Sequence, residues 1–191
     1  MHSVETFQLA YSGITTVVVL PAIFWEEWKT LCKEYKFDIH HTLAIGGETR
    51  FHSVKNGLEL ITNDGIVAIH DAARPLVSEK LIISSMEYAE EHGNAVPAII
   101  FNESMRIAEG SISQVVNRNK YRIIQTPQCF RLAQLKSSYR QEYKSEFTDD
   151  ATVLESTGVQ INLIEGENTN LKITIPEDLI MAEALFSKKR L

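Results

Sequence analysis

Short β-branched runs alternate with segments of helical periodicity, and this alternation constrains the fold more than any other feature of the sequence. Ile14–Leu20 is one such run, and apolar residues recur at helical spacing in the segment from Pro21 to Tyr35. We expect further strands at 42–45, 65–69, 95–101, 121–125 and 159–164, and further helices at 50–61, 78–92, 131–143, 149–157 and from 176 onward. This order predicts an α/β fold with a mostly parallel sheet and helices on both faces.

The composition narrows the classes of protein to consider. A length of 191 residues, 44% of them hydrophobic, predicts one domain over residues 1–191. The net charge of −6 argues against a nucleic-acid partner, so any phosphate must be held by locally gathered cations. No run approaches the roughly 18 apolar residues of a membrane span, and no secretory signal is recognisable. Cys32 and Cys129 lack metal-ligand spacing, which favours reduced thiols in a cytoplasmic protein.

The segment IHDAARP, from Ile69 to Pro75, places an acid and an arginine just beyond the end of an apolar strand. In open α/β sheets, ligands bind in the crevice beyond the carboxyl ends of the strands. Asp71 and Arg74 are therefore candidate site residues. The alternative is that Asp71 caps a turn and Arg74 pairs with it on the surface, because structural ion pairs are common.

Polar residues follow other expected strands as well. The stretch from Gly46 to Ser53 opens a helix, where backbone N–H groups can approach a ligand, although an ordinary glycine-containing turn would look the same. Thr126 could be only a turn residue before proline, and Thr148 could simply precede a helix N-cap. Lys172 is expected on a short strand before the last helix, where a lysine is usually solvated.

Taken together, these segments are far more specific than any one of them. The stretches GGETRFHSVKNGL, VAIHDAARP, ESMR, NR, QTPQ, FTDDA and NLKITIPEDL occur in this order along the chain. In order and approximate spacing they resemble the 2-C-methyl-D-erythritol 4-phosphate cytidylyltransferase family of the nucleotidyltransferase superfamily. The resemblance covers essentially the whole chain and implies a Rossmann-like fold.

The resemblance also implies a reaction and a set of site residues. The phosphate of methylerythritol phosphate would attack the α-phosphorus of CTP, with Asp71 holding Mg²⁺ or another divalent cation, the kind of ion that a carboxylate and phosphate oxygens suit. By resemblance Arg118, Lys172 and Asp71 are catalytic. The nucleotide would be bound by Gly47, Glu48, Ser53, Asp71 and Lys172. The second substrate would be bound by Asp71, Arg74, Ser104, Arg118, Thr126 and Thr148.

Residues 102–121 read as a hairpin with a glycine turn at Gly110. An isolated two-stranded hairpin is marginal in water, so it should pack on something. It could fold back on its own domain. The resemblance instead implies an arm that interlocks with its twin in a homodimer and carries Ser104 and Arg118 into the partner's site.

One departure from the family bears on activity. The family begins with a strand and a glycine-rich loop that carries an arginine and a lysine, whereas MHSVETFQ is similar to the helix after that loop. We therefore expect residues 1–191 by themselves to be almost inactive. Two alternatives remain open, namely a cytidylyltransferase for another polyol phosphate such as ribitol 5-phosphate, and a non-catalytic, loop-less dimeric remnant.

Overall fold

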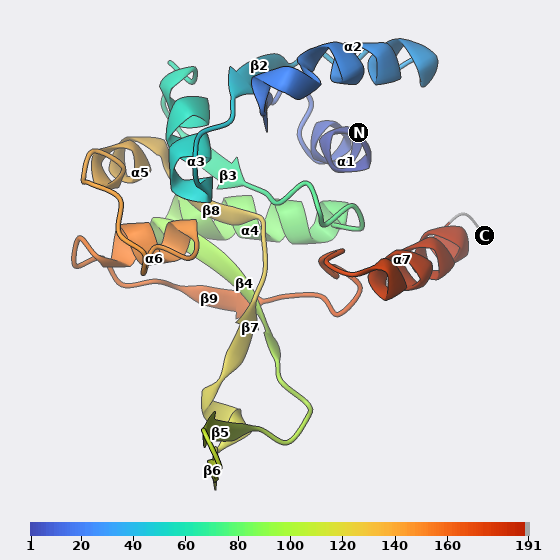
Figure 1. Ribbon diagram of the computed structural model, residues 1–191. Helices are drawn as coiled ribbons and strands as arrows, with labels where there is room; N and C mark the ends of the chain where they lie inside the picture. Colours follow the sequence, from blue (N-terminus) through green and yellow to red (C-terminus); the bar gives the residue numbers. More distant parts are fainter. Residues whose placement is uncertain (190–191) are drawn as a thin grey trace.

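Strands and helices alternate along the chain in the computed structural model, which describes residues 1–189 (Figure 1). The expected helix from the Ser78 cap to the Gly93 stop is confirmed, because the Ser78 hydroxyl accepts from the Leu81 N–H and Gly93 adopts a φ of 93°.

In chain order the elements are α1 (His2–Ala10), β1 (Val17–Leu20), the 3₁₀ helix η1 (Ala22–Phe24), α2 (Trp25–Glu34), β2 (Thr42–Ile45), α3 (Arg50–Glu59), β3 (Ile66–Ile69), α4 (Glu79–His92), β4 (Asn94–Ile100), β5 (Arg106–Glu109), β6 (Ile112–Val115), the 3₁₀ helix η2 (Arg118–Lys120), β7 (Arg122–Ile124), β8 (Gln128–Arg131), α5 (Leu132–Ser138), α6 (Asp150–Glu155), β9 (Leu163–Glu165) and α7 (Pro176–Lys189).

The main sheet has the strand order β3–β8–β4–β7, and β9 also pairs with β4. Strands β1 and β2 pair in parallel in a separate two-stranded sheet. The α/β class is confirmed, but the expectation of a mostly parallel sheet is wrong. Strand β4 is parallel to β9, whereas β7 and β8 run antiparallel to their neighbours. The reason is connectivity, since β7 and β8 carry the chain back after it has run out along β4.

Strands β7 and β8 together form one interrupted strand beside β4. Ile124 pairs with Ala98 and Cys129 pairs with Ala95, while residues 125–127 separate the two halves. Strand β8 continues between β4 and β3, where Gln128 pairs with Ile69. This register brings the interruption, and with it Thr126, beside the carboxyl end of β3.

Helices cover both faces of the main sheet. Val67, Val96 and Phe130 pack with residues of α3, α5 and α6, which lie together at the left of Figure 1. Ala95 and Cys129, which alternate with them along the strands, pack against Ala89 of α4 on the opposite face. Helix α1 covers α4 in turn, through contacts of Phe7 with Leu81 and Ile82.

Several expected boundaries were wrong. The segment expected as a helix at 131–143 begins with the end of β8, and its helix ends at Ser138. The strand expected at 159–164 forms only over Leu163–Glu165. Lys172 lies on an irregular segment rather than on a short strand. These segments are short, and the contacts that define them come from partners distant in sequence.

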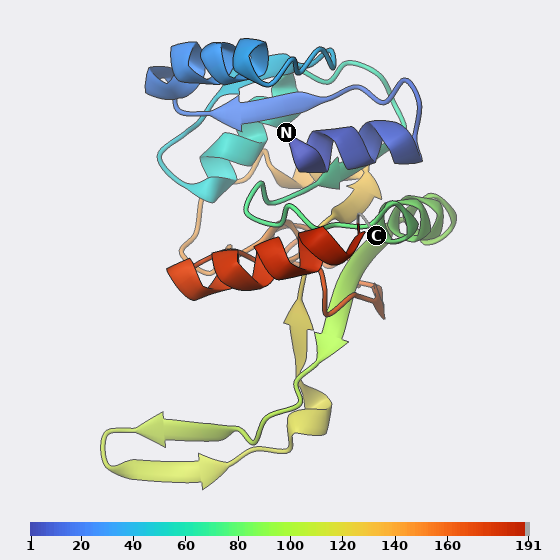
Figure 2. The same ribbon diagram turned by 90° about the vertical axis from the view of Figure 1, so that its right-hand side faces the viewer.

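The hairpin expected within residues 102–121 is confirmed as β5 and β6, with Gly110 at a φ of 58° in its turn. Figure 2 shows it projecting away from the rest of the molecule beyond the ends of β4 and β7. Every residue of its two strands is exposed. The hairpin therefore does not fold back on its own domain.

Candidate active site

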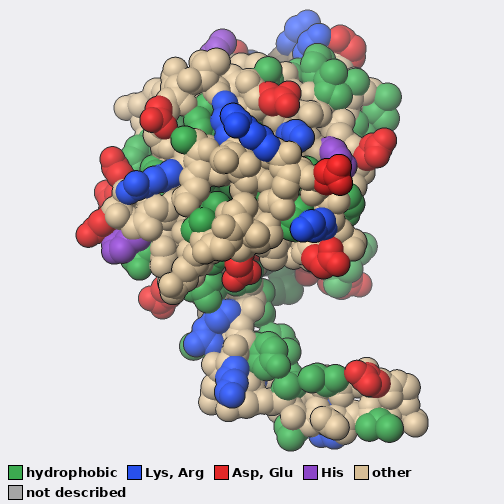
Figure 3. Space-filling model, turned by 90° about the vertical axis from the view of Figure 1, so that its left-hand side faces the viewer, with side chains coloured by type: hydrophobic (Ala, Val, Ile, Leu, Met, Phe, Trp, Pro, Cys, Tyr) green, Lys and Arg blue, Asp and Glu red, His purple; other side chains and the backbone are tan. Residues whose placement is uncertain are grey.

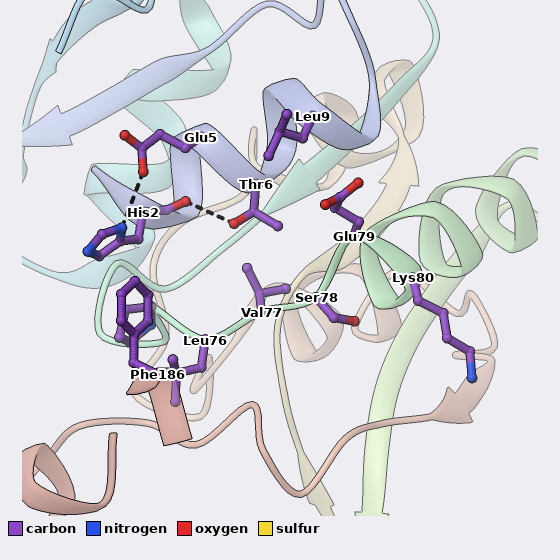
Figure 4. A pocket seen from close by; sticks show the side chains of 11 residues that line it. His2, Glu5, Thr6, Leu9, Leu76, Val77, Ser78, Glu79, Lys80 and Phe186 are labelled. Atoms are coloured by element: carbon purple, nitrogen blue, oxygen red, sulfur yellow. Dashed lines mark hydrogen bonds and ion pairs between the residues drawn. The ribbon is translucent and has the colours of Figure 1, made fainter. Parts of the chain in front are cut away.

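One cavity lies between α1, the start of α4 and α7, and has a volume of about 510 Å³ (Figure 4). Three of its polar residues, all on α1, contact one another. His2 pairs with Glu5 at 3.2 Å, and the Thr6 hydroxyl donates to the His2 carbonyl at 2.9 Å. Lys80 points away from the other labelled side chains in Figure 4. Among the residues whose side chains the structure describes, the cavity therefore offers no converging cations for an anionic ligand.

A second cavity, of about 180 Å³, lies at the carboxyl end of β3, beside the interruption between β7 and β8. It is lined by five charged side chains, three cationic and two anionic, together with several polar groups. Its lining residues are Arg50, Asp71, Arg74, Ile124, Gln125, Thr126, Gln128, Thr148, Asp149 and Lys172. Of the predicted site residues, it brings together Asp71, Arg74, Thr126, Thr148 and Lys172.

Asp71 is the centre of this cavity's charge. Its Oδ2 lies 3.0 Å from Lys172 Nζ and 3.9 Å from Arg74 Nε, and its Oδ1 lies 3.5 Å from Arg50 Nε. Burial by itself would raise the pKa of Asp71, but the three cations outweigh it and hold that pKa below its usual value. Asp71 is therefore an ionised carboxylate with only 16% of its side chain exposed.

The backbone at Asp71 is fixed by a short chain of hydrogen bonds. The Asp71 N–H donates to Thr126 Oγ1 at 3.0 Å, and Thr126 Oγ1 lies 3.1 Å from His70 Nδ1. His70 Nε2 lies 3.0 Å from the Arg74 carbonyl oxygen, which can only accept. His70 therefore carries its proton on Nε2, and the Thr126 hydroxyl donates to Nδ1. Thr126 is buried and its hydroxyl supports the loop from inside.

This arrangement predicts a pH-dependent stability. Burial lowers the pKa of His70 from 6.5 to about 4, so the unfolded chain takes up the proton first as the pH falls. The contribution of neutral His70 to the free energy of unfolding is therefore fully present above about pH 6.5. It is lost as the pH falls toward about 4, and the loss amounts to about 3 kcal/mol for a pKa shift of this size. Urea unfolding in EDTA at pH 7 and pH 4.5 should show a smaller loss for His70→Gln than for the wild-type protein. Equal losses in the two proteins would show that His70 does not titrate in this way.

Arg74 is buried, so it is not a surface residue that simply pairs with Asp71. Its Nη1 and Nη2 donate to the carbonyl oxygens of Asn170 and Ile124 at 2.7 and 3.3 Å, and its buried Nε has no hydrogen-bond partner within the described chain. Burial lowers its pKa, against the opposing effect of Asp71. Arg74 thus joins the loop after β3 to β7 and to the segment that carries Lys172.

The segment of Lys172 reaches the site through backbone contacts. The Ile173 N–H donates to the Ala73 carbonyl at 2.8 Å, and the side-chain amide of Asn170 donates to the Thr126 carbonyl at 2.8 Å. These bonds hold residues 170–173 against the loop after β3 without a strand. Lys172 is 44% exposed and pairs, within residues 1–189, with Asp71 alone.

The remaining predicted residues lie outside this cavity. Ser53 Oγ accepts from the Gly47 N–H and donates to the Thr49 carbonyl, both at 3.0 Å, and Glu48 is exposed. A Cβ at Gly47 would lie 2.4 Å from that of His52, so the turn requires glycine there. Ser104 and Arg118 are exposed on the projecting arm.

Arg50 is a lining residue that the sequence interpretation did not select, although it stands within GGETRFHSVKNGL. A signal was available, because a helix N-terminus favours acids and Arg50 is the first residue of α3. Gln128 and Asp149 were missed as well; the Gln128 amide donates to Asp149 Oδ2 at 2.7 Å. Asp149 also caps α6 in a capping box, as the sequence suggested for this segment.

The comparisons with known proteins agree on one family. The sequence model of the 2-C-methyl-D-erythritol 4-phosphate cytidylyltransferase family matches residues 1–188. The chain is similar to curated proteins of that name, with 43% identity to one from Bacteroides thetaiotaomicron and 44% to one from Bacteroides fragilis. In both cases the likeness spans 97% of this chain and 84% of the relative.

The solved structures give the same result. A crystal structure of 2-C-methyl-D-erythritol 4-phosphate cytidylyltransferase from Thermus thermophilus matches 96% of this chain and 88% of its own, with a TM-score of 0.77 and 31% identity. The structure of a 4-diphosphocytidyl-2C-methyl-D-erythritol synthase from Anaerococcus prevotii covers 97% of this chain and 84% of its own chain, with a TM-score of 0.84. At 24% identity the second likeness concerns the fold alone. The expected Rossmann-like architecture is confirmed.

Proposed function

Since the chain belongs to the 2-C-methyl-D-erythritol 4-phosphate cytidylyltransferase family, we propose that the cavity around Asp71 transfers a cytidylyl group from CTP to 2-C-methyl-D-erythritol 4-phosphate. A phosphate oxygen of the polyol phosphate forms a bond to the α-phosphorus of CTP. The bond between the α-phosphorus and the oxygen that bridges the α- and β-phosphates breaks, and pyrophosphate leaves. The products are CDP-methylerythritol and pyrophosphate, in the non-mevalonate synthesis of isoprenoid precursors.

The observation that carries this proposal is the convergence of Arg50, Arg74 and Lys172 on the single carboxylate of Asp71. Both substrates are anions, so the reaction depends on positioning them and neutralising their charge. A protein with a net charge of −6 has to gather cations locally to do so. The cavity does this beside the carboxyl end of β3, where α/β sheets bind ligands.

Mg²⁺, or another divalent cation, is the cofactor that we expect Asp71 to hold. Within the described residues, no group of three or more His, Cys, Asp or Glu side chains could hold a metal ion. One ionised carboxylate still fits, because Mg²⁺ in such sites is usually bound by one or two carboxylates together with substrate phosphates and water. When bound, the ion neutralises charge on the phosphates.

Of the three cations around Asp71, Lys172 is the one best placed to move and contact a bound substrate. Arg74 is held by two carbonyl oxygens and Arg50 by a second carboxylate, Asp150, at 2.6 Å. Lys172 is the most exposed of the three cations. It can therefore turn from Asp71 to a phosphate of the nucleotide at the reacting centre.

The other assignments follow from the family. We propose that Gly47, Glu48 and Ser53 bind the nucleotide with Asp71 and Lys172. The second substrate would lie against Asp71, Arg74, Thr126 and Thr148. Thr148 is exposed at the cavity and free to offer its hydroxyl, whereas Thr126 and Arg74 would act mainly through the loop that they hold.

We also propose a homodimer formed through the arm of residues 102–121. The arm projects from the body, and Figure 3 shows hydrophobic side chains along it. Ile107, Ile112 and Val115 are 52, 68 and 77% exposed. A solitary hairpin with this apolar surface needs a partner for stability. A second copy would cover it and receive Ser104 and Arg118 in its own site.

No helix in the described part of the chain is long and apolar enough to cross a membrane. Cys32 and Cys129 are both free thiols, and burial raises the pKa of Cys129. We propose a cytoplasmic location, where such thiols remain reduced.

A pyrophosphate-release assay on the complete protein tests the function. With CTP and Mg²⁺, we expect release to depend on methylerythritol phosphate and to be at least about tenfold faster than with ribitol 5-phosphate, because a site built around one set of hydroxyls rejects another. A Lys172→Met preparation serves as the control for contaminating activity. Preference for ribitol 5-phosphate would identify the alternative substrate, and no release with either would favour a non-catalytic protein.

A further inference from the structure

Arg50 occupies an unusual place for an arginine. It is the first residue of α3, directly after the Thr49 cap, where the helix dipole disfavours a cation. An acidic residue at this position would stabilise the helix, whereas an arginine does not. The contacts of the guanidinium, rather than the helix, must therefore account for the residue.

Those contacts join two carboxylates from distant parts of the chain. Arg50 Nη2 lies 2.6 Å from Asp150 Oδ2, and Arg50 Nε lies 3.5 Å from Asp71 Oδ1. Two different nitrogens of one planar group are used, so the two carboxylates are held in a fixed relation. A lysine ammonium, a point charge on a flexible stem, lacks this fixed planar geometry.

Asp150 is a rigid anchor for this bridge. Its side chain is fully buried, and its second oxygen accepts from the Tyr139 hydroxyl at 2.6 Å. The Tyr139 ring is stacked on Phe51 of α3, with ring centroids 4.7 Å apart, so the anchor is packed into the core. Burial would lower the pKa of Arg50, but Asp150 and Asp71 raise it above its usual value, so the guanidinium remains charged.

The two carboxylate oxygens of Asp71 have different neighbours. Oδ1 faces Arg50, which Asp150 immobilises. Oδ2 lies 3.0 Å from Lys172, which is free to turn toward a substrate, and 3.9 Å from Arg74. We propose that Arg50 is a positioning residue that holds the Asp71 carboxylate by Oδ1, and that Asp150 and Tyr139 act on the site through Arg50. The inference rests on the proposed function, in which Asp71 binds the metal of the metal–CTP complex.

The test compares CTP binding with and without Mg²⁺ by calorimetry on the complete protein. Arg50→Lys keeps a charge beside Asp150 but removes the planar guanidinium that faces both Asp150 and Asp71. We expect the gain in CTP affinity that Mg²⁺ provides to fall about tenfold or more, with a 10–100-fold loss in kcat/KM, the usual effect of removing a group that orients a metal ligand. Affinity for CTP without metal should stay unchanged. Tyr139→Phe should act in the same direction, by about fivefold, because it removes one hydrogen bond from the anchor.

Arg131→Lys is the matched control, because Arg131 is exposed and its guanidinium donates to the Glu90 carbonyl at 3.3 Å. Equal losses of CTP affinity with and without Mg²⁺ in Arg50→Lys would mean that Arg50 contacts the nucleotide directly, which overturns the proposal. A lower melting temperature with unchanged binding and kcat/KM would reduce Arg50 to a structural role and overturn it too. If wild-type protein gains no affinity from Mg²⁺, the role given to Asp71 is itself wrong.

Discussion

Replacing Asp71 by asparagine is expected to lower turnover of methylerythritol phosphate and CTP at least about a hundredfold. The substitution keeps the shape of the side chain but removes the one ionised carboxylate on which Arg50, Arg74 and Lys172 converge. Charge stabilisation by a metal held in such a site contributes several kcal/mol, which corresponds to two or more powers of ten in rate. Steady-state rates of pyrophosphate release over a range of Mg²⁺ concentrations measure the effect.

Stability should change much less than activity in this variant. Arg74 is buried and loses the one carboxylate within 4 Å of it in the described part of the chain, while Arg50 keeps Asp150, so we expect a cost of about 1–3 kcal/mol. Thermal unfolding monitored by circular dichroism will show whether the variant is folded at the assay temperature.

Asp64→Asn is the matched control, because Asp64 is an exposed acid at the turn before β3. It should retain wild-type turnover. If folded Asp71→Asn also turns over substrate at a near-normal rate, Asp71 has no part in the mechanism.

Features that depend on neighbouring residues were predictable from the sequence. The helix from Ser78 to Gly93 was predicted from a cap and a stop signal, both of which act within a few residues. Asp71 was predicted from its place after an apolar strand, and it does lie at the carboxyl end of β3. The hairpin of β5 and β6 was predicted from two short runs around Gly110, whereas its role as an arm came from the family resemblance.

Features that depend on distant contacts were not predictable in the same way. Arg50 and Asp150 are 100 residues apart, and no local pattern links them. Strand β8 forms because Gln128–Arg131 fills the space between β3 and β4, although its sequence continues into a helix. Lys172 reaches Asp71 through a bond from Ile173 to Ala73 on an irregular segment, which has no periodicity to detect.

The arm makes it testable which subunit's substrate Arg118 serves. Arg118 lies at the base of the arm, where its Nη1 donates to the Asn102 carbonyl, and it does not line the cavity of its own subunit. If it acts across the proposed dimer, each site combines Asp71 of one subunit with Arg118 of the other. An Arg118→Ala homodimer and an Asp71→Asn homodimer should then both be nearly inactive.

A heterodimer of these two chains is expected to regain activity, up to about half of the wild-type value, because a symmetric dimer has two equivalent sites. One of its sites carries both substitutions and the other carries neither. Co-expression of the complete protein with two different affinity tags, followed by two purification steps, isolates the heterodimer for the pyrophosphate assay. An Asp71→Asn and Lys172→Met heterodimer is the matched control and should stay inactive, because both residues belong to the same subunit's cavity. If the heterodimer that carries Arg118→Ala is as inactive as its parents, Arg118 serves its own subunit and the arm does not exchange residues between sites.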